Sequence, residues 1–464
     1  MKPHHRTALI LAALLGNSVA SGVANAESWA LQFVDTGSNS GAATSLGLSE
    51  EGFPVIAYHS GTGRKLRYAA LDSGDKIWHI QIVDDGGEFT SLGVDSTGIV
   101  HVAYNDALTL QLKYWRKNQT QTSTQFIDQS SGKGGFSYYN SLKVDRQGVP
   151  HVSYYDLRNP DGSVSDDLKY AYLSGAGWVP QTIDGNQERG KYNSLALDAN
   201  GNPQISYFDN SGKLRYAKRS PGSGAWSTEA VDTLYDSGRF NSIQVDAAGL
   251  PHISYTALAT SQLRYAHFDG VQWTIEIVDG IGAIYNGSVT SLTLDRQGDP
   301  HISYYDSALH ALKYASRKTG VWTVEVVDAS GDVGWYSSLL LDAADRPVIS
   351  YYDATTRALK IAYGNYPDGD GDGIPDAFDS CPTDADCNGN GRLDGQEGGV
   401  LLAASGGTGP ARLVGDDSFF GCGSIAAFGA GPRGPGGPGG MDLLFLLVPA
   451  AYVIARRVRA TRAI

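Results

Sequence analysis

The sequence predicts an all-β protein built from seven copies of one four-stranded unit. A motif close to SLxLDxxGxPHISYYD recurs at intervals of 46 to 53 residues. Each copy contains four short runs of alternating or β-branched and aromatic residues, separated by Gly, Pro and Asp turn signals. No copy shows the 3.6-residue apolar spacing of a helix. Four strands in roughly 48 residues are typical of one β-propeller blade. The copies begin at Ser45, Ser91, Ser141, Ser194, Ser242, Ser291 and Ser338.

The fourth strand of each unit indicates how the ring closes. It usually starts with Trp and ends with Asp, and one such strand, Trp29–Asp35, precedes the first set of three strands. The last set, residues 338–363, has no fourth strand after it. Pairing Trp29–Asp35 with that set would leave no free sheet edge. We therefore expect a seven-bladed propeller over residues 27–364, closed by its N-terminal strand. The other fourth strands are Trp78–Asp84, Thr122–Asp128, Trp178–Asp184, Trp226–Asp232, Trp273–Asp279 and Trp322–Asp328.

Residues 1–26 have the pattern of a signal peptide. A basic start is followed by the short apolar run Ala8–Leu15, and Ala24-Asn25-Ala26 fits a small-x-small cleavage site that ends at Ala26. The apolar run is too short to span a membrane. The sequence therefore predicts export and a mature chain that begins at Glu27.

Residues 365–399 form an acidic segment with the pattern of a metal site. Nine acidic residues against one Arg contribute −8 of the chain's formal net charge of −13, so the acidity is local. Two stretches match the twelve-residue loop that offers oxygen ligands to Ca²⁺ at positions 1, 3, 5, 7, 9 and 12, with Gly at position 6. The alternative is a solvated acidic linker. The predicted ligands are Asp368, Asp370, Asp372, the carbonyl of Ile374, Asp376 and Asp379 in the first loop, and Asp386, Asn388, Asn390, the carbonyl of Arg392, Asp394 and Glu397 in the second.

The stretch DGDGDGIPDAFDSCP resembles thrombospondin type 3 repeats. Pro367, Pro375 and Pro382 exclude flanking helices of EF-hand length. The resemblance implies structural Ca²⁺ in an extracellular stalk. A local disulfide between Cys381 and Cys387 fits that setting and an oxidising compartment.

The C-terminal region has the composition of a linker followed by a membrane or sorting segment. Residues 400–440 are rich in Gly, Pro, Ala and Ser, and residues 441–464 contain the apolar run Leu443–Ala455 and then four Arg residues. With Cys422 ahead of it, this arrangement resembles bacterial three-part sorting signals of the MYXO-CTERM type. The resemblance implies proteolytic processing, modification at Cys422 and transfer to the cell surface or outer membrane. The alternative is a plain C-terminal membrane anchor, in which the Arg residues would stay in the cytoplasm.

The links between blades carry the candidate ligand-binding residues. They share one face of the propeller with the links between second and third strands, they vary in length, and they carry aromatic residues that Thr or Asn often follows. Aromatic faces with nearby hydrogen-bonding groups suit sugars or peptides. The alternative is that these residues pack between blades. The candidates are Phe89, Tyr139, Tyr192, Phe240, Tyr285, Trp335 and Tyr336.

Other recurrent residues are expected to hold the scaffold together. His101, His151, His252 and His301 share one repeat position but come from different blades, so each is expected to satisfy a hydrogen bond at its own D-x-x-G turn. An Arg or Lys in the third strand and an Asp at the end of the second strand are expected to pair across strands within a blade.

No catalytic set stands out from the repeat. The D-x-x-G turns resemble those of sialidases, but the Trp expected after the Gly is missing. The sequence therefore predicts an exported bacterial surface protein, whose propeller binds a glycan or a protein without catalysis and whose cofactor is structural Ca²⁺. No nucleic-acid partner is expected. The alternatives are a sialidase-like, glycan-active hydrolase or lyase, and a purely structural envelope component.

Overall fold

The computed structural model describes residues 28–402, except for residues 38, 62–63, 119–120, 129–136, 159–163, 186–188 and 286. The chain divides into two units, Met1–Phe419 and Phe420–Ile464, and the second lies outside the described residues. The predicted signal peptide with Ala26, and the predicted sorting segment with Cys422, lie outside them too. In the described part of the chain, no helix has the length and apolar character needed to cross a membrane.

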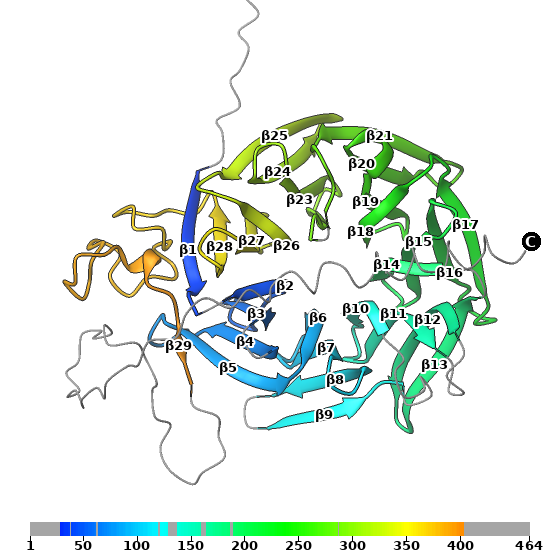
Figure 1. The fold of residues 1–464 in the computed structure, drawn as a ribbon, viewed down its shortest axis with the longest axis horizontal. Helices are drawn as coiled ribbons and strands as arrows, with labels where there is room; N and C mark the ends of the chain where they lie inside the picture. The colour runs from blue at the N-terminus through cyan, green and yellow to red at the C-terminus, as the bar shows by residue number, and fades with distance from the viewer. Residues whose placement is uncertain are drawn as a thin grey trace, which may run out of the picture. The chain divides into compact units, whose positions relative to one another are not determined.

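Seven antiparallel sheets are arranged as a ring, which confirms the predicted seven-bladed propeller (Figure 1). In each blade the first strand lies nearest the centre of the ring and the fourth lies at the rim. Blades one to three comprise β2 (Ser40–Leu48), β3 (Pro54–Ser60), β4 (Lys65–Leu71) and β5 (Trp78–Asp85); β6 (Gly87–Val94), β7 (Val100–Asp106), β8 (Gln111–Lys117) and β9 (Thr122–Phe126); and β10 (Ser137–Val144), β11 (Pro150–Arg158), β12 (Val164–Ser174) and β13 (Gly177–Asp184).

The remaining four blades repeat this order, and the last takes its outer strand from the N-terminus. They comprise β14 (Arg189–Leu197), β15 (Pro203–Asp209), β16 (Leu214–Arg219) and β17 (Trp226–Asp232); β18 (Ser237–Val245), β19 (Pro251–Ala257), β20 (Gln262–Phe268) and β21 (Trp273–Gly280); β22 (Thr290–Leu294), β23 (Pro300–Asp306), β24 (Ala311–Lys318) and β25 (Val321–Asp328); and β26 (Val333–Leu341), β27 (Pro347–Asp353), β28 (Ala358–Gly364) and β1 (Trp29–Asp35). The 3₁₀ turns are η1 (Leu258–Thr260) and η2 (Asp394–Gln396).

The N-terminal strand closes the ring as predicted. β1 pairs antiparallel with β28, with Trp29 opposite Gly364 and Phe33 opposite Lys360. Both ends of the propeller therefore lie in one blade, and opening the ring would require β1 to separate from β28.

The recurrent Ser explains how neighbouring blades are joined near the centre of the ring. Each Ser hydroxyl accepts a hydrogen bond from the backbone N–H of the apolar residue that follows the Ser of the next blade, at 2.8 to 3.2 Å. The bond from Leu46 to Ser338 joins the first blade to the last and completes the circle. The pairs are Ser45–Leu92, Ser91–Leu142, Ser141–Leu195, Ser194–Ile243, Ser242–Leu292, Ser291–Leu339 and Ser338–Leu46.

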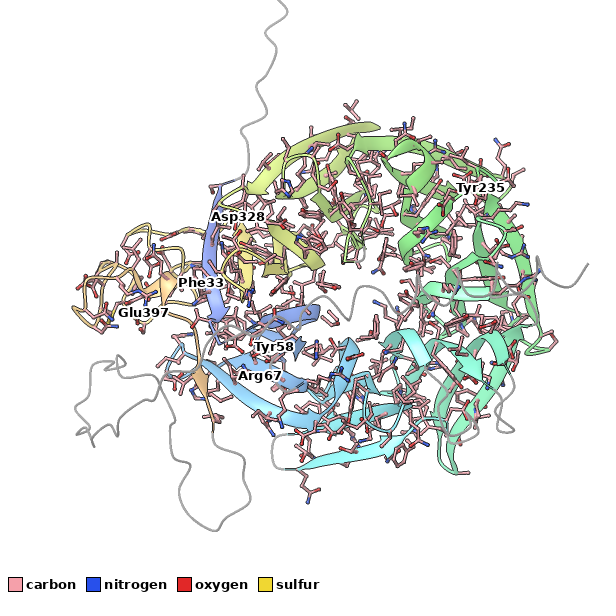
Figure 2. The ribbon with its side chains drawn as sticks, in the orientation of Figure 1. Phe33, Tyr58, Arg67, Tyr235, Asp328 and Glu397 are labelled. Atoms are coloured by element: carbon pink, nitrogen blue, oxygen red, sulfur yellow. A yellow bond between two sulfur atoms is a disulfide. The ribbon has the colours of Figure 1, made fainter. Side chains whose placement is uncertain are left out.

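The recurrent Asp, Tyr and Arg or Lys residues join the blades further out. Asp328, at the end of β25, accepts hydrogen bonds from the Tyr351 hydroxyl at 2.7 Å and from Lys360 Nζ at 2.6 Å, both in the next blade. The prediction of pairing within blades is therefore incomplete, because the Lys or Arg side chain also contacts an Asp of the preceding blade. Figure 2 marks Asp328 and the equivalent pair Tyr58 and Arg67. The seven sets are Asp35–Tyr58–Arg67, Asp84–Tyr104–Lys113, Asp128–Tyr154–Lys169, Asp184–Tyr207–Arg215, Asp232–Tyr255–Arg264, Asp279–Tyr304–Lys313 and Asp328–Tyr351–Lys360.

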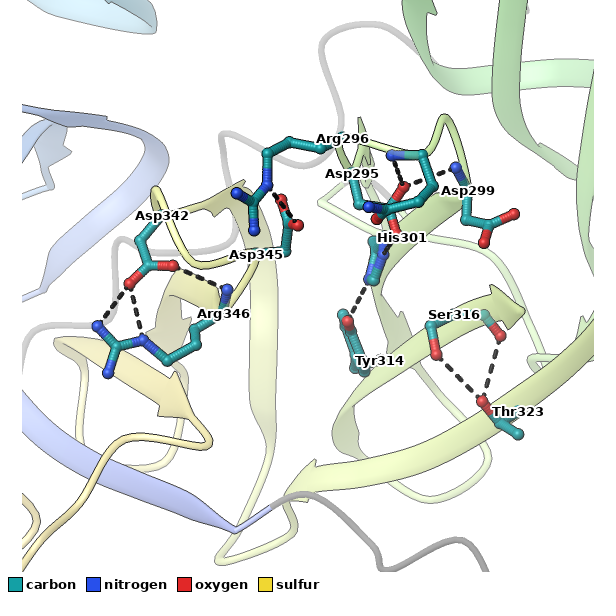
Figure 3. A network of polar contacts seen from close by, with 11 residues as sticks. Asp295, Arg296, Asp299, His301, Tyr314, Ser316, Thr323, Asp342, Asp345 and Arg346 are labelled. Carbon is teal, nitrogen blue, oxygen red and sulfur yellow. Dashed lines mark hydrogen bonds and ion pairs between the residues drawn. The ribbon is translucent and has the colours of Figure 1, made fainter. Parts of the chain in front are cut away.

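Each recurrent His serves its own turn, as predicted from the sequence. Asp295 Oδ1 accepts hydrogen bonds from the N–H groups of Gln297 and Asp299, and its Oδ2 lies 3.4 Å from His301 Nε2 (Figure 3). The other nitrogen of His301 bonds to the hydroxyl of Tyr314. His101, His151 and His252 have equivalent partners. These imidazoles are part of the scaffold.

Replacing one of these His residues should reduce the acid sensitivity of the fold. Burial lowers the pKa of His301 in the folded protein, so the unfolded chain binds a proton first and stability falls as pH drops below about 6.5. Gln204 occupies the equivalent position in blade four and accepts a hydrogen bond from Tyr216. We expect His301→Gln to keep the fold and to lose less thermal stability than wild type between pH 7 and pH 5. The control is His310→Gln, whose side chain is exposed; an equal loss in His301→Gln and wild type would contradict this account.

The acidic segment packs against the propeller. Tyr366, Ile374 and Phe378 are buried in one apolar cluster with Val34 of β1 and Trp78 of β5. The short strand β29 (Val400–Leu401) pairs in parallel with β5 as a fifth strand of blade one. Figure 1 shows the segment beside β1, outside the ring. It therefore bridges the first and last blades, across the place where the ring closes.

Candidate functional site

The two acidic loops share four equivalent internal hydrogen bonds, which shows that their backbones fold alike. The carboxylate at position 1 accepts a bond from the Gly N–H at position 6, in Asp368–Gly373 at 3.2 Å and in Asp386–Gly391 at 2.7 Å. Both Gly residues have positive φ, 98° and 85°, which suits Gly and strains other residues. Three further bonds from a backbone N–H to a side-chain oxygen occur in both loops. Gly369 to Asp376 corresponds to Cys387 to Asp394, Asp372 to Asp370 corresponds to Asn390 to Asn388, and Ile374 to Asp372 corresponds to Arg392 to Asn390.

The first loop brings several carboxylates close together. Asp368, Asp370 and Asp372 each offer an oxygen, and these oxygens lie within 4.8 Å of one another. Asp372 is 4% exposed and its Oδ2 has no hydrogen-bond partner among the described residues; the same is true of Asp379 Oδ2. Burial, followed by the nearby carboxylates, raises the pKa of Asp372 to about 7. A buried and unpaired carboxylate is costly, and hard oxygen ligands of this kind suit Ca²⁺.

The second loop is more exposed and has amide side chains at two of the predicted ligand positions. Glu397 accepts hydrogen bonds from the side chains of Asn388, at 2.9 Å, and Asn390. Burial raises the pKa of Asp394, whose Oδ1 has no partner among the described residues. The disulfide Cys381–Cys387, which the sequence resemblance implied, joins the connection between the loops to the start of the second loop.

The predicted aromatic residues of the inner strands occupy an unusual backbone position. Two residues before the recurrent Ser, six of the seven blades place a residue other than Gly in the left-handed region, and the pairing with the second strand is interrupted there. Bulky residues rarely adopt this conformation without a compensating interaction. These residues are Ala43, Phe89, Tyr139, Tyr192, Phe240 and Tyr336, with φ between 49° and 55°.

Most of these aromatic rings pack on one another across the blades. The ring centres lie 5.5 Å apart in Phe89–Tyr139, and 4.4 Å apart in both Tyr139–Tyr192 and Tyr192–Phe240. Tyr192 and Phe240 are 9% and 8% exposed. The residue just before the recurrent Ser also bonds between blades, as when the Thr290 hydroxyl donates to the Phe240 carbonyl at 3.0 Å. Phe89, Tyr139, Tyr192 and Phe240 therefore contribute mainly to packing between blades.

Tyr285 and Trp335 have a different environment from the other predicted residues. Tyr285 is 53% exposed, and its ring stacks with that of Trp335 at a centre distance of 6.5 Å. Trp335 Nε1 and the Tyr305 hydroxyl both donate to Asp332 Oδ1, at 2.8 and 2.6 Å. His310 Nδ1 lies 3.1 Å from the Tyr305 hydroxyl. This group, which we call the blade 6–7 cluster, comprises Tyr285, Tyr305, His310, Asp332 and Trp335.

Sequence reasoning missed three members of the blade 6–7 cluster. Tyr305 belongs to the repeat motif, and His310 and Asp332 lie in short links without a shared motif. A signal was available at Trp335, because the position three residues before the recurrent Ser differs in every blade. It is occupied by Ala42, Glu88, Tyr138, Lys191, Arg239, Ser288 and Trp335.

Comparison with known proteins identifies the fold and no family. No protein-family model matches the chain, and no curated protein matches it in sequence. Among solved structures, an ulvan lyase bound to a GlcA(1-4)Rha3S saccharide is 12% identical, with a TM-score of 0.50 over 72% of this chain and 95% of the lyase. The six-bladed fungal lectin of Aleuria aurantia is 14% identical, with a TM-score of 0.44 over 64% of this chain and 98% of the lectin. AofleA from Arthrobotrys oligospora is 13% identical, with a TM-score of 0.44 over 66% and 90%. These similarities concern the propeller architecture.

Proposed function

We propose that this is an exported cell-surface protein whose propeller binds a glycan without catalysis. The observation that carries the proposal is a comparison among the seven blades of this chain. The residues that join blades recur, namely Ser near the centre of the ring and the Asp, Tyr and Arg or Lys sets further out. The position occupied by Trp335 differs in every blade, and in six of the seven it lies near the start of the first strand, next to the link from the preceding blade. Positions that do not follow the repeat are not needed to join the blades. Residues at such positions, beside loops, often carry binding functions.

Glycan binding is favoured over protein binding by the chemistry of the blade 6–7 cluster. An exposed aromatic ring beside a carboxylate and an imidazole offers an apolar surface next to hydrogen-bonding groups. The cluster is small and polar at its edge, whereas a protein interface needs a wider surface of about 800 Å² on each partner.

We also propose that the acidic segment binds two Ca²⁺ ions that have a structural role. Asp368, Asp370, Asp372, the Ile374 carbonyl, Asp376 and Asp379 would hold one ion, and the equivalent residues from Asp386 to Glu397 the other. The matching hydrogen bonds of the two loops and the unpartnered Oδ2 of Asp372 support this assignment.

Export to a bacterial surface is supported by the pattern of residues 1–26, by the disulfide and by the composition of the C-terminus. The disulfide Cys381–Cys387 fits an oxidising compartment. We propose cleavage after Ala26 and retention or processing through residues 441–464, with Cys422 as the modified residue.

A glycan lyase is the second candidate function. It is favoured by the proximity of His310 to the Tyr305 hydroxyl, which could serve proton transfer. Burial, and then Asp332, raises the pKa of Tyr305, and its hydroxyl donates to that carboxylate, so Tyr305 is a poor base. Binding without catalysis therefore agrees better with the geometry.

A glycan array tests this proposal. The full chain should bind a restricted set of oligosaccharides in the presence of Ca²⁺, and prolonged incubation should release no unsaturated or shortened product. Absence of binding to any glycan would overturn the glycan proposal and leave a protein partner or a structural role. Product release would establish the lyase or hydrolase alternative.

A further inference from the structure

The blade 6–7 cluster is assembled from three separate links at one place on the propeller. Tyr285 comes from the link between β21 and β22, His310 from the turn between β23 and β24, and Asp332 from the link between β25 and β26. Trp335 follows in β26 itself. The residues belong to blades that are adjacent in the ring (Figure 1). No other described link brings an exposed aromatic ring, a carboxylate and an imidazole together in this way.

The aromatic rings of this cluster are held in place before any ligand binds. Trp335 Nε1 donates to Asp332 Oδ1, and the ring also packs on Tyr305 at a centre distance of 4.8 Å. The link at Gly287 lies against the same ring, because a Cβ atom there would be 2.6 Å from Trp335 Cε3. A site that is fixed in advance avoids the entropy cost of ordering side chains on binding.

The exposed parts of the cluster have the chemistry of a sugar-binding site. Tyr285 is 53% exposed and presents ring surface to which the C–H face of a pyranose can pack. Asp332 uses Oδ1 for Trp335 and Tyr305, while its Oδ2 accepts no hydrogen bond from a described residue and its side chain is 37% exposed. The side chain of His310 is 63% exposed. A carboxylate oxygen accepts hydrogen bonds from sugar hydroxyls, and its negative charge disfavours uronates and sulfated sugars.

We propose that Tyr285, Asp332, His310 and Trp335 form a binding site for a neutral pyranose residue. This inference rests on the proposed glycan-binding function and specifies its location and ligand class. The apolar face of the sugar packs against Tyr285, and adjacent hydroxyls bond to Asp332 Oδ2 and to the imidazole of His310. Trp335 positions Asp332 and supports the Tyr285 ring.

The test compares two matched tyrosine variants on a defined glycan panel. The panel contains neutral oligosaccharides of glucose, galactose, mannose, fucose and N-acetylglucosamine, together with uronate-containing and sulfated ones. Tyr285→Ala in the full chain should weaken binding of the neutral ligand at least about tenfold. Tyr235→Ala is the control, because Tyr235 is 71% exposed in the link between β17 and β18 and has no ring partner among the described residues. It should leave affinity within about twofold of wild type.

A second variant separates the polar contribution from a loss of folding. In Asp332→Asn the side-chain oxygen can still accept from Trp335 and Tyr305, so the melting temperature should stay near that of wild type while neutral-sugar affinity falls several-fold. If wild type binds a glycan and Tyr285→Ala binds it equally well, this site is wrong and the proposed function stands. Preference for acidic glycans would overturn the ligand class. Absence of binding to the whole panel would overturn this inference together with the glycan proposal.

Discussion

Removal of Ca²⁺ with EGTA is expected to lower the melting temperature of the propeller by roughly 5 °C or more. Each site would add about 2.7 kcal/mol to stability at a free Ca²⁺ concentration one hundred times its Kd. Two sites give about 5 kcal/mol, and unfolding entropies near 2.1 cal/mol/K per residue convert this into about 5–7 °C for the described domain. The effect reaches the propeller because Ile374 and Phe378 share a core with β1 and β5. Calorimetry with and without EGTA measures it.

A pair of substitutions identifies the acidic loops as the source of this effect. Asp372→Asn removes a buried negative charge, so without Ca²⁺ the variant should melt above wild type, and with Ca²⁺ it should melt below. Asp384→Asn is the control, since Asp384 is exposed and is not among the predicted ligands. Equal melting temperatures of wild type with Ca²⁺ and with EGTA would contradict the calcium proposal.

Asp328→Ala is expected to destabilise the propeller by about 3–5 kcal/mol, the usual cost of removing one partner of a buried ion pair. Lys360 would keep only Asp353, at 3.9 Å, as a carboxylate partner. Lys360 is 5% exposed and Tyr351 is fully buried, so neither can replace the lost carboxylate with water. Burial opposes ionisation of Asp328, yet Lys360 and Tyr351 hold its pKa below the usual value. The pair therefore adds stability at neutral pH that is lost as the pH falls through the folded pKa.

An exposed ion pair provides the comparison for Asp328. Arg296 is bonded to Asp345 at 2.8 Å, and its side chain is 67% exposed (Figure 3). Arg296→Ala should cost less than about 1 kcal/mol, because water screens the pair. Urea denaturation of both variants measures the difference. Similar losses in the two would show that the Asp, Tyr and Lys sets do not join the blades as described.

The repeat made the architecture predictable, and its regular residues were interpreted more reliably than its links. Trp29–Asp35 could be assigned to the last blade because that blade lacked a fourth strand. The role of His301 followed from its spacing to the D-x-x-G turn. The connection of Asp328 to Lys360 did not follow, because sequence spacing does not show that the end of one blade lies against the third strand of the next.

The candidate sites were predicted in part, for physical reasons that differ between them. The left-handed backbone at Tyr192 and Phe240 contradicts local preference and is held by packing between blades, which local sequence cannot reveal. Asp332 and His310 come together only when separate links meet in space. In the acidic segment, the spacing of the predicted ligands can be read from the sequence. That the segment packs on the propeller through Phe378 and Tyr366 was not predicted.

Hydrogen exchange with the strongest ligand from the glycan array tests most directly whether the links between blades form the recognition surface. The account predicts that ligand slows exchange in residues 281–290, 307–311 and 329–336 and leaves the D-x-x-G turns, such as 295–298, unchanged. Those turns lie at the opposite ends of the same strands, so exchange rates in the links and in the turns report on the two faces of the propeller separately. Protection confined to the D-x-x-G turns would contradict the account and place recognition on the opposite face of the propeller.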